Sequence, residues 1–192
     1  MARPLAGLDF ETYGDVNLPK HGLARYVDGP TFTPLLASFV TKSVEEEFDF
    51  VRYPHRHVAR FRDVVEEFVL DADGILVAHN VGFERAVLRR MSIDPDVLPN
   101  MVDSAVISRA MGAASSLEGA SNQLTDLPKM EEGKRLIQKF SVPNEGNSWQ
   151  APTPELVQSS RFRYDWALFQ TYCTGDARAS LLIAQQYLES GN

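Results

Sequence analysis

The stretch Leu5–Thr12 reads LAGLDFET, a short apolar run that ends in two acids, Asp9 and Glu11, with one residue between them. If this run is a strand, both acids point to the same face, because side chains alternate with a period of two. Adjacent carboxylates repel each other and are costly to desolvate, and a bound divalent cation removes both penalties. The pair therefore favours a metal site, although a solvated strand edge would also carry it and a metal site needs further ligands.

Two later segments offer such ligands. Glu84 lies in the first turn of a helix expected over Gly82–Met91, which follows a buried apolar strand and which Asn80 is expected to cap. Near the C-terminus, Tyr172 and Asp176 are four residues apart in a segment with apolar residues at helical spacing, so they share a helix face. A phenol and a carboxylate one turn apart can address one metal-bound water.

In this order, an Asp-x-Glu, an Asn-x-x-aromatic-acid and a Tyr-x-x-x-Asp resemble the three motifs of the DnaQ-like (DEDD) 3′–5′ exonucleases. The tyrosine marks the DEDDy branch, which includes the proofreading domain of family A DNA polymerases and the ribonuclease D group. The histidine branch has His five residues before the last Asp, where this chain has Thr171. Three finer features are similar to the proofreading part of phage-type DNA polymerase I: the segments 78–85 and 133–141, and Cys173 beside the tyrosine. The resemblance covers nearly the whole chain.

The resemblance implies a metal-dependent 3′–5′ exonuclease with two divalent ions, Mg²⁺ or Mn²⁺. Asp9 would bridge both ions, Glu11 and Asp176 would complete one site, and Glu84 would serve the other. Tyr172 would orient the attacking water, and the product would be a nucleoside 5′-monophosphate. The chain departs from the family at Glu84, where Asp is usual, so the resemblance leaves open whether this carboxylate binds metal directly or through water.

The expected substrate is DNA, preferably a single-stranded or frayed 3′ end, because the phosphate must enter a narrow acidic pocket. The resemblance places Thr12 and Phe83 near the terminal nucleotide and Asn80 in the same binding motif. A basic cluster in the segment that resembles the family is expected to hold the strand, and comprises Lys134, Arg135 and Lys139. Trp149 and Tyr164, in or beside a long loop, would either stack on a base or anchor the loop to the core.

The alternation of elements predicts a mixed α/β sheet, and the resemblance implies a ribonuclease-H-like fold: a five-stranded mixed β-sheet flanked by α-helices, with the first strand central. Expected strands are Leu5–Phe10, Leu35–Thr41, Glu47–Arg52, Ile75–His79 and a short one near Met101. Expected helices are Val58–Leu70, Gly82–Met91, Ser104–Met111, a broken stretch near Leu117–Leu124 and Glu131–Lys139, and Asp165–Leu188. Two long loops, Thr12–Pro34 and Ser141–Arg163, are expected to be functional or disordered.

Three polar residues near these motifs are expected to have structural roles. Asp103 precedes a helix and is expected to cap it, although a place near the metals would also suit it. His79 is expected to be a hydrogen-bonded histidine at a strand end rather than a base. Cys173 is the only cysteine, so it forms no internal disulfide, fits a reducing cytoplasm, and is expected to pack within its helix.

Composition bounds the remaining possibilities. With 192 residues, 44% hydrophobic and 23% charged, the chain suits one domain over residues 1–192 with a real core. No run of about 18 apolar residues occurs, so no membrane partner is expected. The expected location is cytoplasmic, or the host cytoplasm for a phage-encoded protein. The net charge of −7 disfavours strong non-specific binding to nucleic acid.

Other functions stay open at this point. A stand-alone exonuclease would carry these motifs, and so would the proofreading half of a split polymerase, with a DNA polymerase subunit as its partner. A ribonuclease-D-like exoribonuclease would use the same chemistry on RNA. A catalytically weak module that binds a polymerase or a strand is the alternative of a different class, and Glu84 is the feature that supports it.

Overall fold

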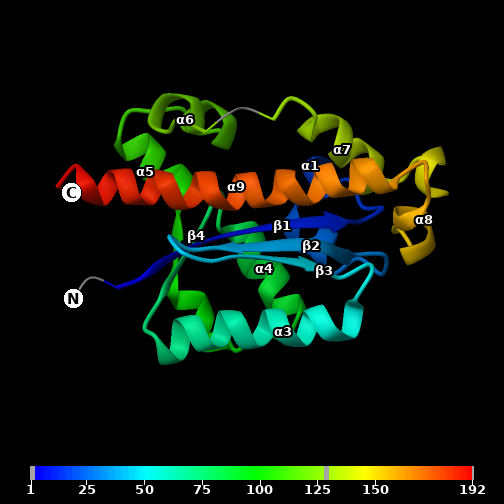
Figure 1. Cartoon of the computed structure of the whole chain (residues 1–192), viewed down its shortest axis with the longest axis horizontal. Helices are drawn as coiled ribbons and strands as arrows, with labels where there is room; N and C mark the ends of the chain where they lie inside the picture. The colour runs from blue at the N-terminus through cyan, green and yellow to red at the C-terminus, as the bar shows by residue number, and fades with distance from the viewer. Residues whose placement is uncertain (1–2, 128–129, 192) are drawn as a thin grey trace.

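The computed structural model describes residues 3–127 and 130–191. Five strands form one mixed sheet in the order β3-β2-β1-β4-β5 (Figure 1). The central strand β1 pairs antiparallel with β2 and parallel with β4, while β3 and β5 form the two edges. This is the predicted ribonuclease-H-like α/β fold. The strands are β1 Leu5–Tyr13, β2 Thr33–Val40, β3 Glu45–Asp49, β4 Ile75–Ala78 and β5 Met101–Asp103.

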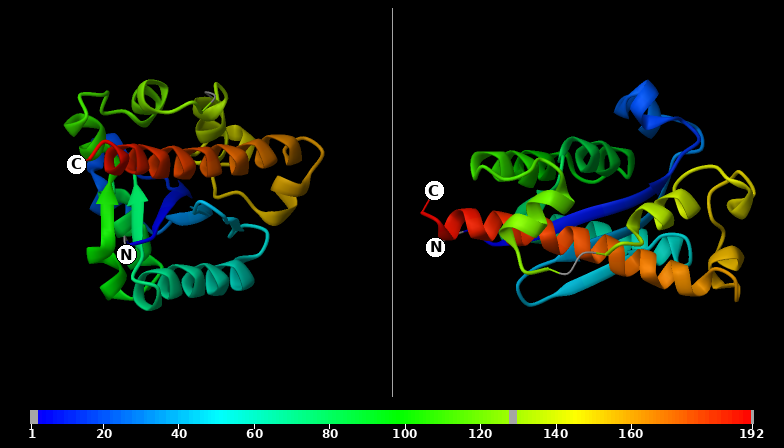
Figure 2. Two further views of the ribbon diagram at one scale, coloured as in Figure 1. Left: turned by 60° about the vertical axis from the view of Figure 1, so that its left-hand side comes forward. Right: turned by 90° about the horizontal axis from the view of Figure 1, so that it is seen from above.

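Helices cover both faces of the sheet. The long helix α9 lies across one face with α5, α6 and α7 beside it, and α3 and α4 cover the other face (Figures 1 and 2). The α-helices are α1 Leu18–His21, α2 Leu23–Val27, α3 Pro54–Glu66, α4 Gly82–Arg90, α5 Ser104–Ala110, α6 Leu117–Leu124, α7 Gly133–Phe140, α8 Pro154–Gln158 and α9 Arg163–Glu189. A π-helical turn, η1 Glu67–Asp71, continues α3, and two 3₁₀ turns are η2 Pro95–Asn100 and η3 Glu145–Asn147. Among the described residues, no helix is long and apolar enough to cross a membrane.

The two faces of β1 differ in the way that its alternating sequence predicts. Leu8 and Phe10 pack with Phe61 of α3 in the larger core cluster, and the rings of Phe10 and Phe61 meet edge to face at 5.3 Å. Asp9 and Glu11 point the other way, toward α9, because side chains alternate along a strand. The fold therefore places the acidic pair between the sheet and its longest helix.

A second core cluster fixes the N-terminal half of α9. Phe140 of α7 packs edge to face on Trp166 of α9 at 5.0 Å and stacks on Phe169 at 5.4 Å. The indole Nε1 of Trp166 donates to Asp49 Oδ2 at 2.6 Å, which ties α9 to the end of β3. The ring of Tyr172 stacks on Phe169, so this aromatic cluster reaches the candidate site.

Several expected boundaries were wrong. β1 continues to Tyr13, so the acidic pair lies within the strand and not at its end. The third strand ends at Asp49 and does not reach Arg52, because the Asp49 carboxylate accepts from the Arg52 backbone N–H at 2.7 Å and turns the chain. The loop expected over Thr12–Pro34 contains α1 and α2, and the loop over Ser141–Arg163 contains η3 and α8.

Candidate active site

Helix α9 and strand β1 bring the two ends of the sequence together. Both acids of β1 face α9, and the Cys173 thiol donates to the backbone oxygen of Asp9 at 3.5 Å. Asp176 follows Cys173 by three residues and therefore lies about one turn farther along the same helix. Cys173 is fully buried, which confirms its predicted packing role.

Four carboxyl groups act on one another at this place. Burial raises the pKa of Asp9 well above its usual value, and the charges of Asp176, Glu11 and Glu84 raise it further. Burial and the charge of Asp176 likewise raise the pKa of Glu11, whose side chain is 7% exposed. Like charges raise a carboxyl pKa in this way only at short range, so Asp9 lies near the other three predicted acids.

Glu84 occupies the first turn of α4, next to the end of β4. Its side chain is 3% exposed, and burial raises its pKa to about 8. Its Oε2 atom is buried and has no hydrogen-bond partner among the described residues. A buried carboxylate oxygen without a partner is costly, and a bound cation is one group that would satisfy it.

Tyr172 and Asp176 form a pair on α9. Burial raises the pKa of the Asp176 carboxyl to about 6, while the nearby Tyr172 hydroxyl acts in the opposite direction and lowers it. Burial and the charge of Asp176 raise the pKa of Tyr172 far above that of a free phenol. The ring is held against the start of α7, because a Cβ on Gly133 would lie 2.3 Å from Tyr172 Cε2.

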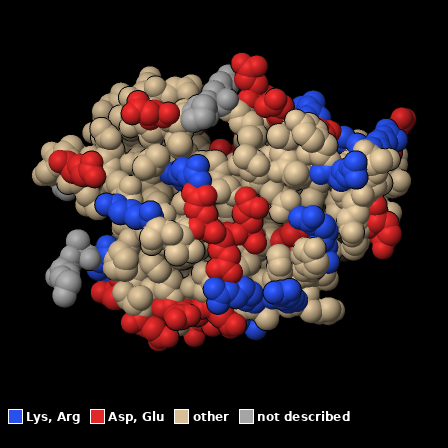
Figure 3. Space-filling model, viewed as in Figure 1, with Lys and Arg blue, Asp and Glu red and all other residues tan. Residues whose placement is uncertain are grey.

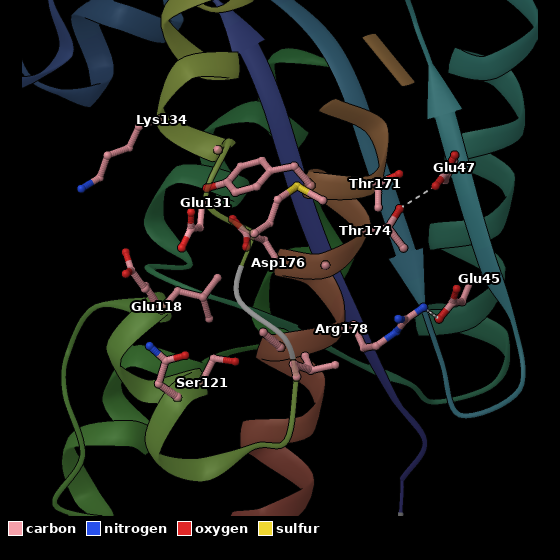
Figure 4. Close-up of a pocket in the computed structure, with 18 residues that line it drawn as sticks. Glu45, Glu47, Glu118, Ser121, Glu131, Lys134, Thr171, Thr174, Asp176 and Arg178 are labelled. Carbon is pink, nitrogen blue, oxygen red and sulfur yellow. Dashed lines mark hydrogen bonds and ion pairs between the residues drawn. The ribbon is translucent and has the colours of Figure 1, made fainter. Parts of the chain in front are cut away.

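A cavity of about 520 Å³ opens beside this pair, between α9 and the segments α6 and α7. Tyr172 and Asp176 line it, whereas Asp9, Glu11 and Glu84 are not among its lining residues. Figure 4 shows acidic side chains around it, with Lys134 at its rim, and Figure 3 shows acidic side chains gathered near the centre of the face that carries α9. Such a lining repels a phosphate unless a cation is present.

Thr12 and Phe83 both contact Tyr26, a residue that was not predicted from the sequence. Thr12 Oγ1 shares a hydrogen bond of 2.8 Å with the hydroxyl of Tyr26 on α2, and the Phe83 ring lies 6.3 Å from the Tyr26 ring. The charge of Glu11 is among the influences that raise the pKa of Tyr26. Leu23, Tyr26 and Val27 have the spacing of a buried helix face, a signal that was present in the sequence.

Asn80 does not cap α4 as predicted. Its backbone has a left-handed φ of 60°, and within the described residues no side chain caps this helix. The Asn80 backbone N–H instead donates to Asp103 Oδ1 at 3.0 Å. The same Oδ1 accepts from the Ala105 N–H at 2.9 Å, so the prediction that Asp103 caps a helix is confirmed. His79 is hydrogen bonded through both ring nitrogens, to Ser104 Oγ and Ser115 O, as expected.

The predicted basic cluster on α7 is divided. Arg135 and Lys139 both donate to the carboxylate of Asp165, and these hydrogen bonds, that of Arg135 above all, lower the pKa of that carboxyl to about 2. Lys134 lines the cavity. Trp149 and Tyr164 are 65% and 72% exposed, so the interpretation that they anchor the loop to the core was wrong.

The four carboxylates do not form a ready ligand cage. Among the described residues, no group of three or more His, Cys, Asp or Glu side chains is arranged to hold a metal ion. Mg²⁺ commonly binds through one or two carboxylates, several waters and substrate phosphates, so it does not require such a cage. The unpartnered oxygen of Glu84 and the hard oxygen donors around Asp9 fit an ion of this kind.

Comparison of the sequence with models of known protein families finds no match, and a search of curated proteins finds no similar sequence.

Proposed function

We propose that this chain is a metal-dependent 3′–5′ exonuclease that releases nucleoside 5′-monophosphates from DNA. The observation that carries the proposal is the convergence on Asp9 of carboxyl groups from β1, α4 and α9, beside the phenol of Tyr172. Strained clusters of like charge are typical of functional sites, because burial and repulsion there are not offset by a structural counter-ion.

Asp9, Glu11 and Asp176 are the residues that would hold divalent ions, with Glu84 acting directly or through water. Mg²⁺ and Mn²⁺ suit these oxygen donors. When bound, such ions supply an activated water and stabilise the oxygen that leaves. The net charge of −7 and the acidic cavity imply that a DNA phosphate approaches only with a cation present, so activity should depend strictly on metal.

Tyr172 orients the attacking water rather than removing its proton. Its pKa is raised far above that of a free phenol, so the hydroxyl keeps its proton at neutral pH and can only donate or accept a hydrogen bond. Contacts with Phe169 and Gly133 fix the ring, which limits the positions that the hydroxyl can take. A fixed donor of this kind lowers the entropy cost of placing the water.

A gel time course tests the proposal. Purified protein is incubated with 5′-labelled single-stranded DNA in Mg²⁺, Mn²⁺ or EDTA, beside RNA of the same sequence. We expect a descending ladder on DNA that EDTA and Asp9→Ala abolish, while Asp71→Ala, an exposed acid that follows α3, leaves it unchanged. A ladder on RNA alone would make RNA the substrate. A ladder that survives Asp9→Ala would refute the proposed site.

One observation favours a second function. The described part of the chain has no ready ligand cage, which would suit a catalytically weak module that binds a strand or a polymerase without cutting. Such a module would bind single-stranded DNA equally well in EDTA and in Mg²⁺, and it would yield no ladder. The exonuclease would instead bind substrate more tightly when Ca²⁺, which has the same oxygen preference, replaces the catalytic ion.

A further inference from the structure

Buried polar groups connect α9 to the sheet immediately beside the candidate site. Ser38 of β2 and Thr174 of α9 are 1% and 7% exposed, and their hydroxyl oxygens lie 2.9 Å apart. Thr174 also donates to Glu47 Oε1 of β3 at 2.8 Å. Figure 4 shows the contact between Thr174 and Glu47 at the wall of the cavity.

The donors in this chain of hydrogen bonds have one consistent direction. An ionised Glu47 can only accept, so the single proton of the Thr174 hydroxyl is directed to it. Ser38 must then donate its own proton to the Thr174 oxygen. The negative charge of Glu47 at the outer end thus orders both hydroxyls, and hydrogen bonds to a charged group are the stronger kind.

Two neighbouring contacts extend the connection to three strands. The Cys173 thiol donates to the backbone oxygen of Asp9 on β1, and Arg178 pairs with Glu45 on β3. Residues 173, 174 and 178 of α9 are thereby joined to β1, β2 and β3. Asp176 lies inside this six-residue segment, so the contacts surround the carboxylate that must face Asp9.

The apolar contacts nearby do not set a register by themselves. Val40, Ala177 and Leu181 form a small cluster between the sheet and α9, and burial of such groups is non-directional. These apolar contacts therefore specify the rotation of this part of α9 less sharply than a hydrogen bond does. A hydrogen bond depends on distance and angle, so the Ser38–Thr174–Glu47 chain permits one position of α9. Buried polar groups are known to serve as devices that fix register.

We propose that Thr174 is a positioning residue, which with Ser38 and Glu47 sets the rotation of α9 and so holds Asp176 and Tyr172 toward Asp9 and Glu11. The proposal depends on the exonuclease function proposed above, because it assigns to that site the device that aligns it. Loss of the Thr174 hydroxyl should leave Ser38 buried without its partner and let α9 settle in more than one position.

The test compares Thr174→Val, which keeps the shape, with Thr174→Ser, which keeps the hydroxyl. Thr33→Val on β2 is the matched control, because the Thr33 hydroxyl donates to the backbone oxygen of Thr31, two residues away, at 3.1 Å. Glu47→Ala, at the exposed end, is a second variant that does not disturb the core. The readouts are the Mn²⁺ concentration for half-maximal cleavage of single-stranded DNA and the Mn²⁺-induced rise in Tm.

We expect Thr174→Val to raise the half-maximal Mn²⁺ concentration by about ten- to a hundredfold, the range usual for residues that orient metal ligands. Glu47→Ala should raise the half-maximal Mn²⁺ concentration by a smaller factor, and Thr174→Ser and Thr33→Val should stay near wild type.

Wild-type behaviour of Thr174→Val would overturn the positioning role while leaving the exonuclease intact. If the wild-type chain cuts nothing, the proposed function fails, and loss of the Mn²⁺-induced Tm rise in Thr174→Val alone would still support the positioning role. A wild-type chain that shows no Mn²⁺-induced rise would overturn both.

Discussion

Gly7 of β1 lies directly beneath Ala177 of α9, and a Cβ on Gly7 would lie 2.0 Å from the Ala177 carbonyl oxygen. No side chain fits between the strand and the helix at this point. Gly7 shares a strand face with Asp9, and Ala177 follows Asp176 directly. The distance between two of the candidate carboxylates is therefore governed by a glycine that takes no part in the chemistry.

Gly7→Ala should destabilise the protein and impair the site together. The added methyl group must push the α9 backbone away, a form of overpacking that typically costs about 1–3 kcal/mol and sometimes more. Urea denaturation would measure the loss, and a cleavage assay on the folded fraction should show a higher half-maximal Mn²⁺ concentration. The control is Gly175→Ala in α9, where a Cβ would meet nothing within 4 Å. Helix propensity predicts that this change is stabilising by up to about 1 kcal/mol. Equal effects of the two substitutions would contradict the packing argument.

The sheet and the candidate acids were predicted from the sequence more accurately than the contacts of the residues around them. The strands and the long helix were predicted from hydrophobic periodicity. This pattern shows which side of an element is buried, and it can be recognised without knowing which residues that side contacts. Asn80 was misjudged because an Asn before a helix is a frequent cap, whereas here its backbone bonds to Asp103, 23 residues away. Tyr26 was missed because its importance comes from contacts with Thr12 and Phe83 that only the folded chain creates.

The pairing of the basic residues on α7 could not be predicted from the sequence either. A run of positive charges predicts a surface for phosphate, but sequence alone cannot show that Asp165 already pairs with Arg135 and Lys139. The reverse holds for Trp149 and Tyr164, whose spacing was equally compatible with burial and exposure. Their environment is decided by the path of the segment over 141–163, which no periodic pattern encodes.

Stability without metal should fall as the pH rises from about 4.5 to about 8. Burial raises the folded-state pKa of Glu84 from 4.5 to about 8 and that of Asp176 from 3.8 to about 6. Across this window the folded state holds more protons than the unfolded chain, so the free energy of unfolding decreases with rising pH. Thermal melts in EDTA should show the decline, since about 1 kcal/mol moves Tm by roughly 2–4 °C in a domain of this size.

Glu84→Gln isolates the contribution of this one carboxyl. Burial lowers the pKa values of His57 and His79. These two groups therefore raise the free energy of unfolding as the pH rises, which partly offsets the decrease caused by the acids. The difference between wild type and Glu84→Gln cancels the histidines. We expect the variant to have the shallower decline and the higher Tm near pH 8.5, and Mn²⁺ to remove the decline in wild type. A parallel pH profile for the two proteins would show that Glu84 is not the buried acid described.

Tyr26→Phe should weaken the site through Thr12. The change removes only the hydroxyl and leaves Thr12 Oγ1 buried without its partner at 2.8 Å, at a cost of about 1–3 kcal/mol. We expect Tyr26→Phe to lower kcat/KM on single-stranded DNA several-fold, and we expect Thr12→Val to lower it by a similar factor. Because both remove one interaction, the double variant should cost less than the sum of the two. Tyr13→Phe is the control, since the Tyr13 hydroxyl is buried with no partner among the described residues and its removal should be neutral or stabilising. Simple additivity would show that the two hydroxyls act separately.

Trp149 should report the path of the DNA strand. Ser148 and Trp149 both have left-handed backbones, with φ of 55° and 60°, an uncommon pair of conformations that holds the indole in solvent at 65% exposure. The chain has two tryptophans, and Trp166 is buried with its indole bonded to Asp49, so it should not respond to ligand. Stacking on a base is worth about 1–3 kcal/mol.

We therefore expect oligothymidylate in Ca²⁺, which replaces the catalytic ion, to quench the exposed indole, and Trp149→Phe to abolish the change without unfolding the protein. Tyr164→Ala, which removes the other exposed ring, should lower the affinity measured by anisotropy of a labelled strand. High salt should weaken binding less than it would for a purely basic surface, because Arg135 and Lys139 are already paired with Asp165. Binding detected by anisotropy with no change in Trp149 emission would place the strand elsewhere on the molecule.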